Sequence, residues 1–174
     1  MGNAPDMLFE VREGAWYGWP DFIGDEPVTA AQYRPERGPA PTFVLANHDE
    51  LPYPRRPLPR FPPHSAAAKF DVAPAATHEW VGQIFVALFG DETPMTAPAA
   101  PPVGRTLVRI DPDGWNLNEI VLEGPSRPID VRFNPVDGVL YIIDFGQFEM
   151  HGERGVIAEA GTGRLWRLGF ELRR

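Results

Sequence analysis

Short apolar runs recur at even spacing along the second half of the chain, and each run ends at a turn signal. Residues 83–89 (QIFVALF) are almost continuously apolar, which is typical of a strand that is covered on both faces. Residues 106–110 follow and end at 111–114 (DPDG), where proline and glycine favour a tight turn. Further strands are expected at 119–122, 129–133, 139–144 and 164–168.

Helical periodicity is weak throughout the sequence. No segment repeats apolar residues about every 3.6 positions over the length of a helix. We therefore expect helix to be a minor component and the chain to be all-β.

The strands form an approximate internal repeat. Residues 84–87 and 107–110 in one unit correspond to 140–143 and 165–168 in the next. Repeats of about 40–50 residues are typical of β-propeller blades. The first unit has room for four antiparallel strands, with 66–72 innermost, whereas the second provides three. The pattern predicts a propeller segment of about two four-stranded blades, with the missing strand supplied from elsewhere.

The first 63 residues differ in character from the rest. Between 35 and 63 proline recurs every few residues, and because proline has no backbone donor we expect an extended surface loop. Residues 16–20 (WYGWP) place glycine and proline in an aromatic cluster, which predicts a turn that inserts rings into a neighbouring core. The sequence thus divides into an N-terminal lead-in, 1–63, and C-terminal propeller blades, 64–174.

Composition limits the functions that the chain can have. The 174 residues carry a formal net charge of −8 and include no cysteine. An acidic surface disfavours nucleic acid, whose phosphates need basic partners. The lack of cysteine removes disulfides, thiolate nucleophiles and Cys-based zinc sites. No secretory leader is visible, and no apolar stretch approaches the roughly 20 residues of a membrane span. We expect neither a nucleic-acid nor a membrane partner.

Several phrases resemble, in the same order, the glucose/sorbosone dehydrogenase family of quinoprotein propellers, especially its sorbosone-dehydrogenase-like branch. The phrases are 16–20 (WYGWP), 81–87 (VGQIFVA), 127–131 (RPIDV), 137–146 (DGVLYIIDFG) and 161–168 (GTGRLWRL). The family is a six-bladed propeller that oxidises aldose- or sorbosone-type sugars with pyrroloquinoline quinone (PQQ) and uses calcium, and its members are usually periplasmic or secreted. The resemblance implies that this chain covers only the C-terminal part of a partial six-bladed propeller.

The resemblance also implies residues for a cofactor site. Arg127 takes the position of an arginine that reaches the quinone carboxylates, with which a guanidinium pairs well. His64 and Ser65 stand in the loop where relatives present polar residues to the cofactor. The family's second arginine is Ile129 here, and its cofactor lysine falls within 89–91 (FGD), which contains no cation. The family's general-base histidine belongs to earlier blades, so no catalytic residue and no metal ligand is assigned.

Each candidate also has a plain structural interpretation. Arg127 can be an ordinary loop arginine near Asp130, and His64 a solvent-facing residue. Residues 48–50 (HDE) offer nitrogen and oxygen ligands, but adjacent residues do not converge easily on one ion, so a solvated loop is favoured. Residues 111–114 begin like a calcium loop but lack the glutamate at its twelfth position, which favours a simple turn.

Three functional hypotheses follow. The chain is the C-terminal portion of a sugar dehydrogenase-like quinoprotein that is not active alone, or it is a non-catalytic propeller-derived binding or assembly module that has lost the redox site. In the third, the chain self-associates, or a partner chain completes the ring through open sheet edges. A sugar ligand could stack on Trp16, Tyr17 or Trp19, although packing is the more common use of such rings. Phe89 and Ile129, in the place of cofactor cations, favour the loss of independent catalysis.

Overall fold

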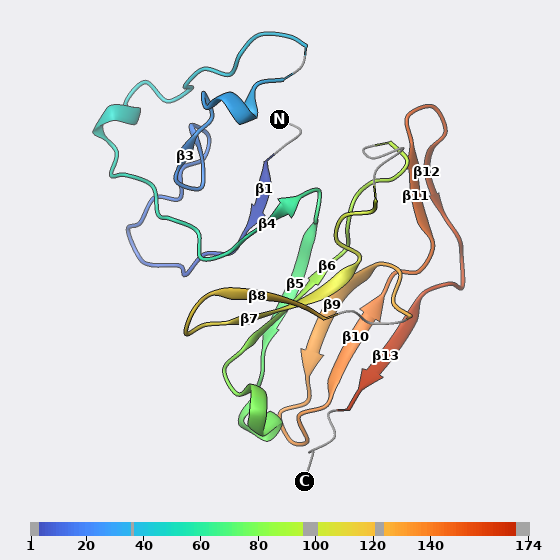
Figure 1. The fold of residues 1–174 in the computed structure, drawn as a ribbon. Helices are drawn as coiled ribbons and strands as arrows, with labels where there is room; N and C mark the ends of the chain where they lie inside the picture. The colour runs from blue at the N-terminus through green and yellow to red at the C-terminus, as the bar shows by residue number, and fades with distance from the viewer. Residues whose placement is uncertain (1–3, 36, 96–100, 121–123, 170–174) are drawn as a thin grey trace. The chain divides into compact units, whose positions relative to one another are not determined.

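The computed structural model describes residues 4–35, 37–95, 101–120 and 124–169 (Figure 1). Strands make up 36% of the structure and helix 7%, which confirms the prediction of an all-β chain. The described helical segments are short 3-10 turns: η1 (Ala31–Tyr33), η2 (His48–Glu50) and η3 (Ala75–Trp80). Within the described part of the chain, no helix has the length and apolar character needed to cross a membrane. The chain forms two compact units, Met1–Pro63 and His64–Arg174.

The first unit contains two small antiparallel sheets. β1 (Pro5–Met7) pairs with β4 (Arg60–Pro63), and β2 (Phe22–Ile23) pairs with β3 (Glu26–Pro27). The prediction of an unpaired proline-rich loop is therefore wrong at its C-terminal end. A two-stranded sheet leaves one edge of each strand open, and the missing N–H of a proline is tolerated at such an edge.

Polar anchors hold the first unit around an apolar core of Ile23, Val28 and Tyr33. Asp21 is fully buried, and its carboxylate accepts hydrogen bonds from the backbone N–H groups of Val44 (2.6 Å) and Leu45 (3.1 Å). These bonds fix the loop that follows residue 42, because a buried carboxylate is stable only when its oxygens are paired.

Arg60 provides a second anchor of the first unit. Its guanidinium forms ion pairs with Asp25 and with Glu26, the latter at 2.6 Å. Glu26 also accepts a hydrogen bond from the hydroxyl of Tyr33. Burial, together with this hydrogen bond to a carboxylate, raises the pKa of Tyr33 to about 12.

The second unit begins with a four-stranded antiparallel sheet whose strands follow chain order. They are β5 (Ala67–Val72), β6 (Ile84–Leu88), β7 (Thr106–Asp111) and β8 (Asn116–Ile120). Residues 85–88 of β6 are all buried, as the continuous apolar run predicts. The predicted strand at 119–122 is described only to Ile120.

The turn between β7 and β8 forms as predicted. The Asp111 carboxylate accepts a hydrogen bond from the N–H of Asp113 (3.0 Å), and the N–H of Gly114 donates to the Asp111 carbonyl (3.3 Å). An aspartate that bonds its own backbone two residues on is a common way to start a turn.

A three-stranded antiparallel sheet follows, in the order β13-β10-β9. Its strands are β9 (Pro128–Phe133), β10 (Leu140–Asp144) and β13 (Arg164–Leu168), which confirms three predicted strands. The turn from β9 to β10 contains Gly138 at φ +71°, where an added Cβ would lie 2.8 Å from the Ala76 carbonyl oxygen. Both the backbone conformation and the lack of space require glycine there.

A hairpin interrupts this sheet between β10 and β13, and the sequence did not predict it. It pairs β11 (Phe148–His151) with β12 (Gly155–Ala158). Every residue of β12 is exposed, so no alternation of buried and exposed positions marks it as a strand.

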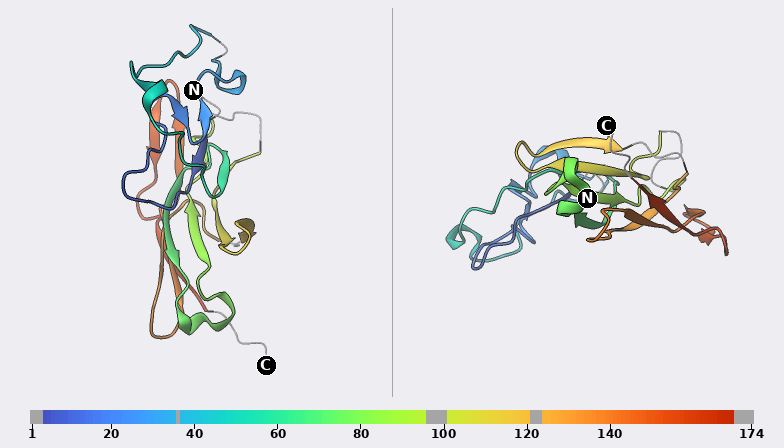
Figure 2. Two further views of the ribbon diagram at one scale, coloured as in Figure 1. Left: turned by 90° about the vertical axis from the view of Figure 1, so that its left-hand side faces the viewer. Right: turned by 90° about the horizontal axis from the view of Figure 1, so that it is seen from below.

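The two sheets of the second unit pack against each other through one apolar core, and Figure 2 shows the orange-to-red sheet beside the green-to-yellow one. The core combines residues of both sheets: Phe85, Ala87, Leu107, Val131, Phe133, Leu140 and Ile142. The rings of Phe85 and Phe133 meet edge-on at 5.0 Å. The Asp71 carboxylate of β5 accepts a hydrogen bond from the N–H of Phe133 on β9 (2.8 Å), which links the first strands of the two sheets.

Candidate functional site

Arg127, the predicted cofactor arginine, lies in the interior of the second unit. Its side chain is 2% exposed. Its Nη1 donates hydrogen bonds to the carbonyl oxygens of Phe89 (3.2 Å) and Asp91, and its Nη2 donates to that of Phe148 (3.2 Å). The guanidinium therefore ties the segment after β6 to the start of β11.

Two aromatic rings enclose the same guanidinium. Its central carbon lies 5.0 Å from the ring centroid of Phe89 and 5.2 Å from that of Phe148. These two rings and Phe145 also contact one another edge-on at 5.0 to 5.8 Å. Aromatic faces attract a cation, and a desolvated contact of this kind is worth about 2 kcal/mol.

Asp91 supplies the negative charge beside Arg127. Its Oδ1 lies 3.9 Å from Nη1 of Arg127 and accepts a 3.0 Å hydrogen bond from Arg105, while its Oδ2 accepts one from the N–H of Val103 (3.1 Å). Burial alone would raise the pKa of Asp91, but hydrogen bonds from Thr93, Val103 and Arg105 hold it below its usual value. The carboxylate therefore stays ionised and balances the buried charge of Arg127.

Burial is also the largest influence on the pKa of Arg127. Burial lowers its pKa, the positive charge of Arg105 lowers it further, and Asp91 opposes both effects. The sequence suggested Asp130 as the acidic neighbour of an ordinary loop arginine at position 127. In the structure Asp130 instead forms an ion pair with Arg132 (3.5 Å) at the surface of β9.

The other two predicted site residues lie at the start of β5. Ser65 is fully buried, and its carbonyl accepts a hydrogen bond from the N–H of Gly90 (2.9 Å). His64 is exposed and adopts a positive φ of 68°, and Ala66 on the other side of Ser65 adopts one of 49°. Ser65 and Arg127 thus both contact the segment 89–91, whereas the His64 side chain faces solvent.

Asp144, which the sequence did not single out, fixes the loop that carries Arg127. Its carboxylate accepts hydrogen bonds from the N–H groups of Ser126 (2.9 Å), Arg127 (2.7 Å) and Gly146 (3.1 Å), and from the indole of Trp166 (3.3 Å). Burial would raise the pKa of Asp144, but these hydrogen bonds lower it. An aspartate at the end of a strand, two residues before a glycine, was the available signal.

The geometry around Arg127 does not fit a carboxylate-bearing cofactor. The guanidinium already donates to three carbonyl oxygens and is covered by two rings, so a quinone carboxylate would have to open this packing to reach it. The described residues also contain no group of three or more metal-ligating His, Asp or Glu side chains. Binding of PQQ and calcium by Arg127, His64 and Ser65 stays a prediction.

The outer face of the second sheet carries exposed apolar residues. Ile143 on β10 and Leu165 on β13 form a cross-strand pair, and they are 46% and 68% exposed. Their neighbours in the strands, Ile142 and Trp166, point the opposite way and belong to the packed core or lie against it. Among the described strands, β13 pairs only with β10, so its other edge is open.

The aromatic residues of the predicted turn at 16–20 do not share one environment. Trp19 is 73% exposed, so the prediction that this turn inserts its rings into a core is wrong for that residue. Trp16 lies edge-on against Phe22 at 5.6 Å, and the Tyr17 hydroxyl donates to the carbonyl of Glu10 (3.1 Å).

Comparison with known proteins gave no match to a family model, to a curated protein or to a solved structure. The resemblance to glucose/sorbosone dehydrogenases therefore depends only on the sequence phrases quoted above. Function has to be argued from the geometry of the chain.

Proposed function

We propose that this chain is a non-catalytic, propeller-derived assembly module, whose two sheets are successive blades and whose second sheet packs against a further blade. The arrangement of the strands supports the interpretation of the two sheets as blades. β5 to β8 form an antiparallel meander, and the first strands of the two sheets, β5 and β9, lie against each other. Blades placed radially around an axis bring their innermost strands together in this way.

The observation that carries the proposal is the exposed apolar pair of Ile143 and Leu165. A sheet inside a propeller is covered on both faces, and the burial of residues 85–88 of β6 agrees with such a position for the first sheet. In the second sheet the inner face is packed while the outer face presents these two residues to solvent. Covering a large aliphatic side chain is worth about 1.5–3 kcal/mol, so this face gains free energy when another sheet covers it.

A second copy of the chain is the proposed occupant. Phe70 and Val72 on β5, an edge strand of the first sheet, are 47% and 45% exposed and offer a matching apolar surface. Such head-to-tail contacts close a ring when the rotation between copies permits it.

Sedimentation velocity over a wide range of concentration tests this proposal. We expect the full chain to self-associate and Leu165→Glu to weaken the association by about tenfold to a hundredfold, because the charge replaces a buried contact. Val136→Glu is the matched control, since Val136 is 86% exposed in the turn after β9 and lies outside the proposed contact. A chain that stays monomeric at high concentration, or a control that dissociates equally, would overturn the proposal.

A second candidate is the C-terminal portion of a PQQ-dependent sugar dehydrogenase-like propeller. It is favoured by the unusual backbone around Ser65, where His64 and Ala66 both adopt positive φ, since strained conformations often occur at functional sites. Absorbance titration of PQQ in the presence of calcium, with wild type and His64→Ala, tests it. Tight binding that depends on His64, or oxidation of glucose by the mixture with a dye acceptor, would support this candidate over the assembly module.

A further inference from the structure

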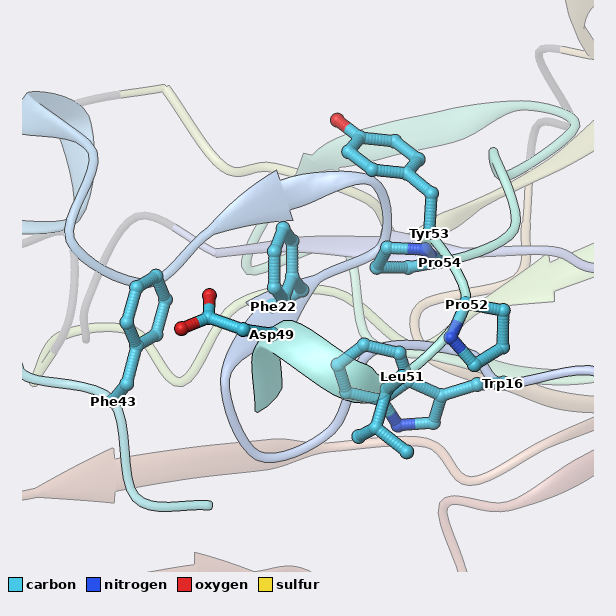
Figure 3. Close-up of a pocket in the computed structure, with 8 residues that line it drawn as sticks. All are labelled: Trp16, Phe22, Phe43, Asp49, Leu51, Pro52, Tyr53 and Pro54. Carbon is cyan, nitrogen blue, oxygen red and sulfur yellow. The ribbon is translucent and has the colours of Figure 1, made fainter. Parts of the chain in front are cut away.

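The first unit contains a concave pocket of about 350 Å³ (Figure 3). Four aromatic rings, a leucine, a carboxylate and two prolines line it. The residues used below are Trp16, Phe22, Phe43, Asp49, Leu51 and Tyr53. Its volume lies near the lower end of the range for small-molecule sites, about 300–1,000 Å³.

Phe22 is the centre of the ring arrangement. Phe43 stacks on it with centroids 5.9 Å apart and planes at 16°, while Trp16 and Tyr53 meet it edge-on at 5.6 and 6.0 Å. Phe22 belongs to β2, so a strand holds the ring in place. The pocket is thus built from parts of the unit that are far apart in sequence.

Hydrogen bonds fix the rings that surround Phe22. The Tyr53 hydroxyl donates to the carbonyl of Asp25 (2.9 Å), and the Trp16 indole donates to the carbonyl of Trp19 (3.3 Å). The buried Asp21 carboxylate holds the backbone that follows Phe43. The aromatic walls are therefore in position before any ligand arrives, which reduces the entropy lost on binding.

The charge of the lining selects the class of ligand. Asp49 is the one ionisable acid or base among the lining residues apart from Tyr53, and in Figure 3 its carboxylate points toward the ring of Phe43. A carboxylate and aromatic faces both attract positive charge. A neutral sugar needs several hydrogen-bonding groups, but the polar atoms of Trp16 and Tyr53 already donate within the protein.

We propose that this pocket binds an organic cation, an ammonium group on a short apolar stem. The ammonium lies against the aromatic faces beside Asp49, and the stem packs against Leu51 and the prolines. This binding needs neither the quinone nor the assembly of the second unit. It would give the chain a ligand site in its N-terminal unit.

A titration with choline and its neutral isostere, 3,3-dimethyl-1-butanol, separates charge from shape. Calorimetry and tryptophan fluorescence of the full chain measure the two affinities, and Trp16 reports from the pocket wall. We expect choline to bind at least about fivefold tighter, since a carboxylate about 4 Å from the cation contributes roughly that factor even in water. We also expect added salt to reduce only the choline affinity. Equal affinities, no choline binding, or binding of glucose in place of choline would overturn the proposal.

Two substitutions locate the site. Asp49→Asn should weaken choline binding about fivefold and leave dimethylbutanol unchanged, whereas Glu50→Gln, the exposed neighbour outside the lining, should change neither. Phe43→Leu should weaken choline binding about twofold to fivefold through loss of an aromatic face. Because Phe43 is 37% exposed, this change should leave the unfolding transition in place. Equal effects of Asp49→Asn and Glu50→Gln would contradict the site.

Further arms of the titration identify the source of the ammonium. Nα-acetyl-trimethyllysine methylamide represents a protein side chain, phosphatidylcholine vesicles represent a lipid surface, and choline represents a free metabolite-sized ligand. Competition by choline against whichever probe binds more tightly would assign that source to the same pocket. Vesicle or peptide binding that choline does not displace would place those ligands elsewhere and count against the proposal.

Discussion

Replacement of Arg127 by methionine tests whether this arginine is the centre of the second unit. Methionine offers an unbranched apolar side chain to the rings of Phe89 and Phe148, which cover the guanidinium, but it has no donor. Three carbonyl oxygens, of which that of Asp91 is buried, lose a charged partner, and such a hydrogen bond is worth about 1.5–3 kcal/mol. The desolvation of the guanidinium offsets part of this sum. We therefore expect a loss of about 3–5 kcal/mol, as for other broken buried ion pairs.

Urea unfolding of the full chain measures this loss in the transition of the second unit. Arg132→Met is the matched control, because Arg132 is 59% exposed and its ion pair with Asp130 should contribute less than about 1 kcal/mol. Arg127→Lys should fall between the two, since an ammonium cannot reproduce the fork of a guanidinium. Hydrogen exchange should be faster in β11, which Arg127 contacts through Phe148. A loss of under about 1 kcal/mol for Arg127→Met would refute the structural role.

Three further predictions concern single side chains. Because the pKa of Asp144 is lowered from 3.8, its ionised form stabilises the fold above about pH 4, and this stabilisation is lost as the pH falls further. In urea unfolding, Asp144→Asn should therefore be less stable than wild type at pH 7, and the difference in unfolding free energy should become smaller in acid. Burial raises the pKa of Tyr33 to about 12, so its hydroxyl should stay neutral at pH 11 in an ultraviolet titration of the folded chain. Its neutral form should stabilise the fold fully below pH 10 and lose this effect between pH 10 and 12, and Tyr33→Phe should remove this loss of stability. Gly138→Ala should lower the free energy of unfolding by at least about 2 kcal/mol and Gly161→Ala by about 1 kcal/mol. Both glycines have positive φ, but only the Cβ added at position 138 would meet a neighbouring carbonyl, so equal losses in thermal unfolding would contradict this reasoning.

The strands of the second unit were predictable because each buried strand has an apolar pattern of its own. Residues 84–88 and 140–144 are strands in the structure, close to the predicted ranges, and both lie in the centres of their sheets. The hairpin β11–β12 was missed because β12 is exposed throughout and therefore has no alternation of buried and exposed positions. β4 was missed because a proline-rich segment argues against pairing, and only the open edge of a two-stranded sheet makes the pairing acceptable.

The candidate sites were less predictable than the strands. The resemblance of residues 127–131 to the dehydrogenase family predicts that Arg127 contacts a cofactor. Whether a loop arginine faces a ligand or the interior, however, depends on which residues lie around it in space. Phe148 is far along the chain from Phe89, and no spacing rule connects them to Arg127. The aromatic pocket of the first unit is likewise assembled from a turn, a strand and two separate loops. Such convergence is a property of the fold.

Because Arg127 has a structural role, the phrase 127–131 is weaker support for the resemblance to the dehydrogenase family. A buried arginine that satisfies three carbonyl oxygens is required by this fold whether or not a quinone binds, so its presence does not argue for redox chemistry. The same holds for Asp144, whose position at the end of β10 is explained by the N–H groups that donate hydrogen bonds to its carboxylate. The two phrases that contain Arg127 and Asp144 are therefore explained by the loops that these side chains hold in the second unit. A module that keeps the blades without the reaction would retain these residues, and the exposed pair of Ile143 and Leu165 is the feature that such a module would use.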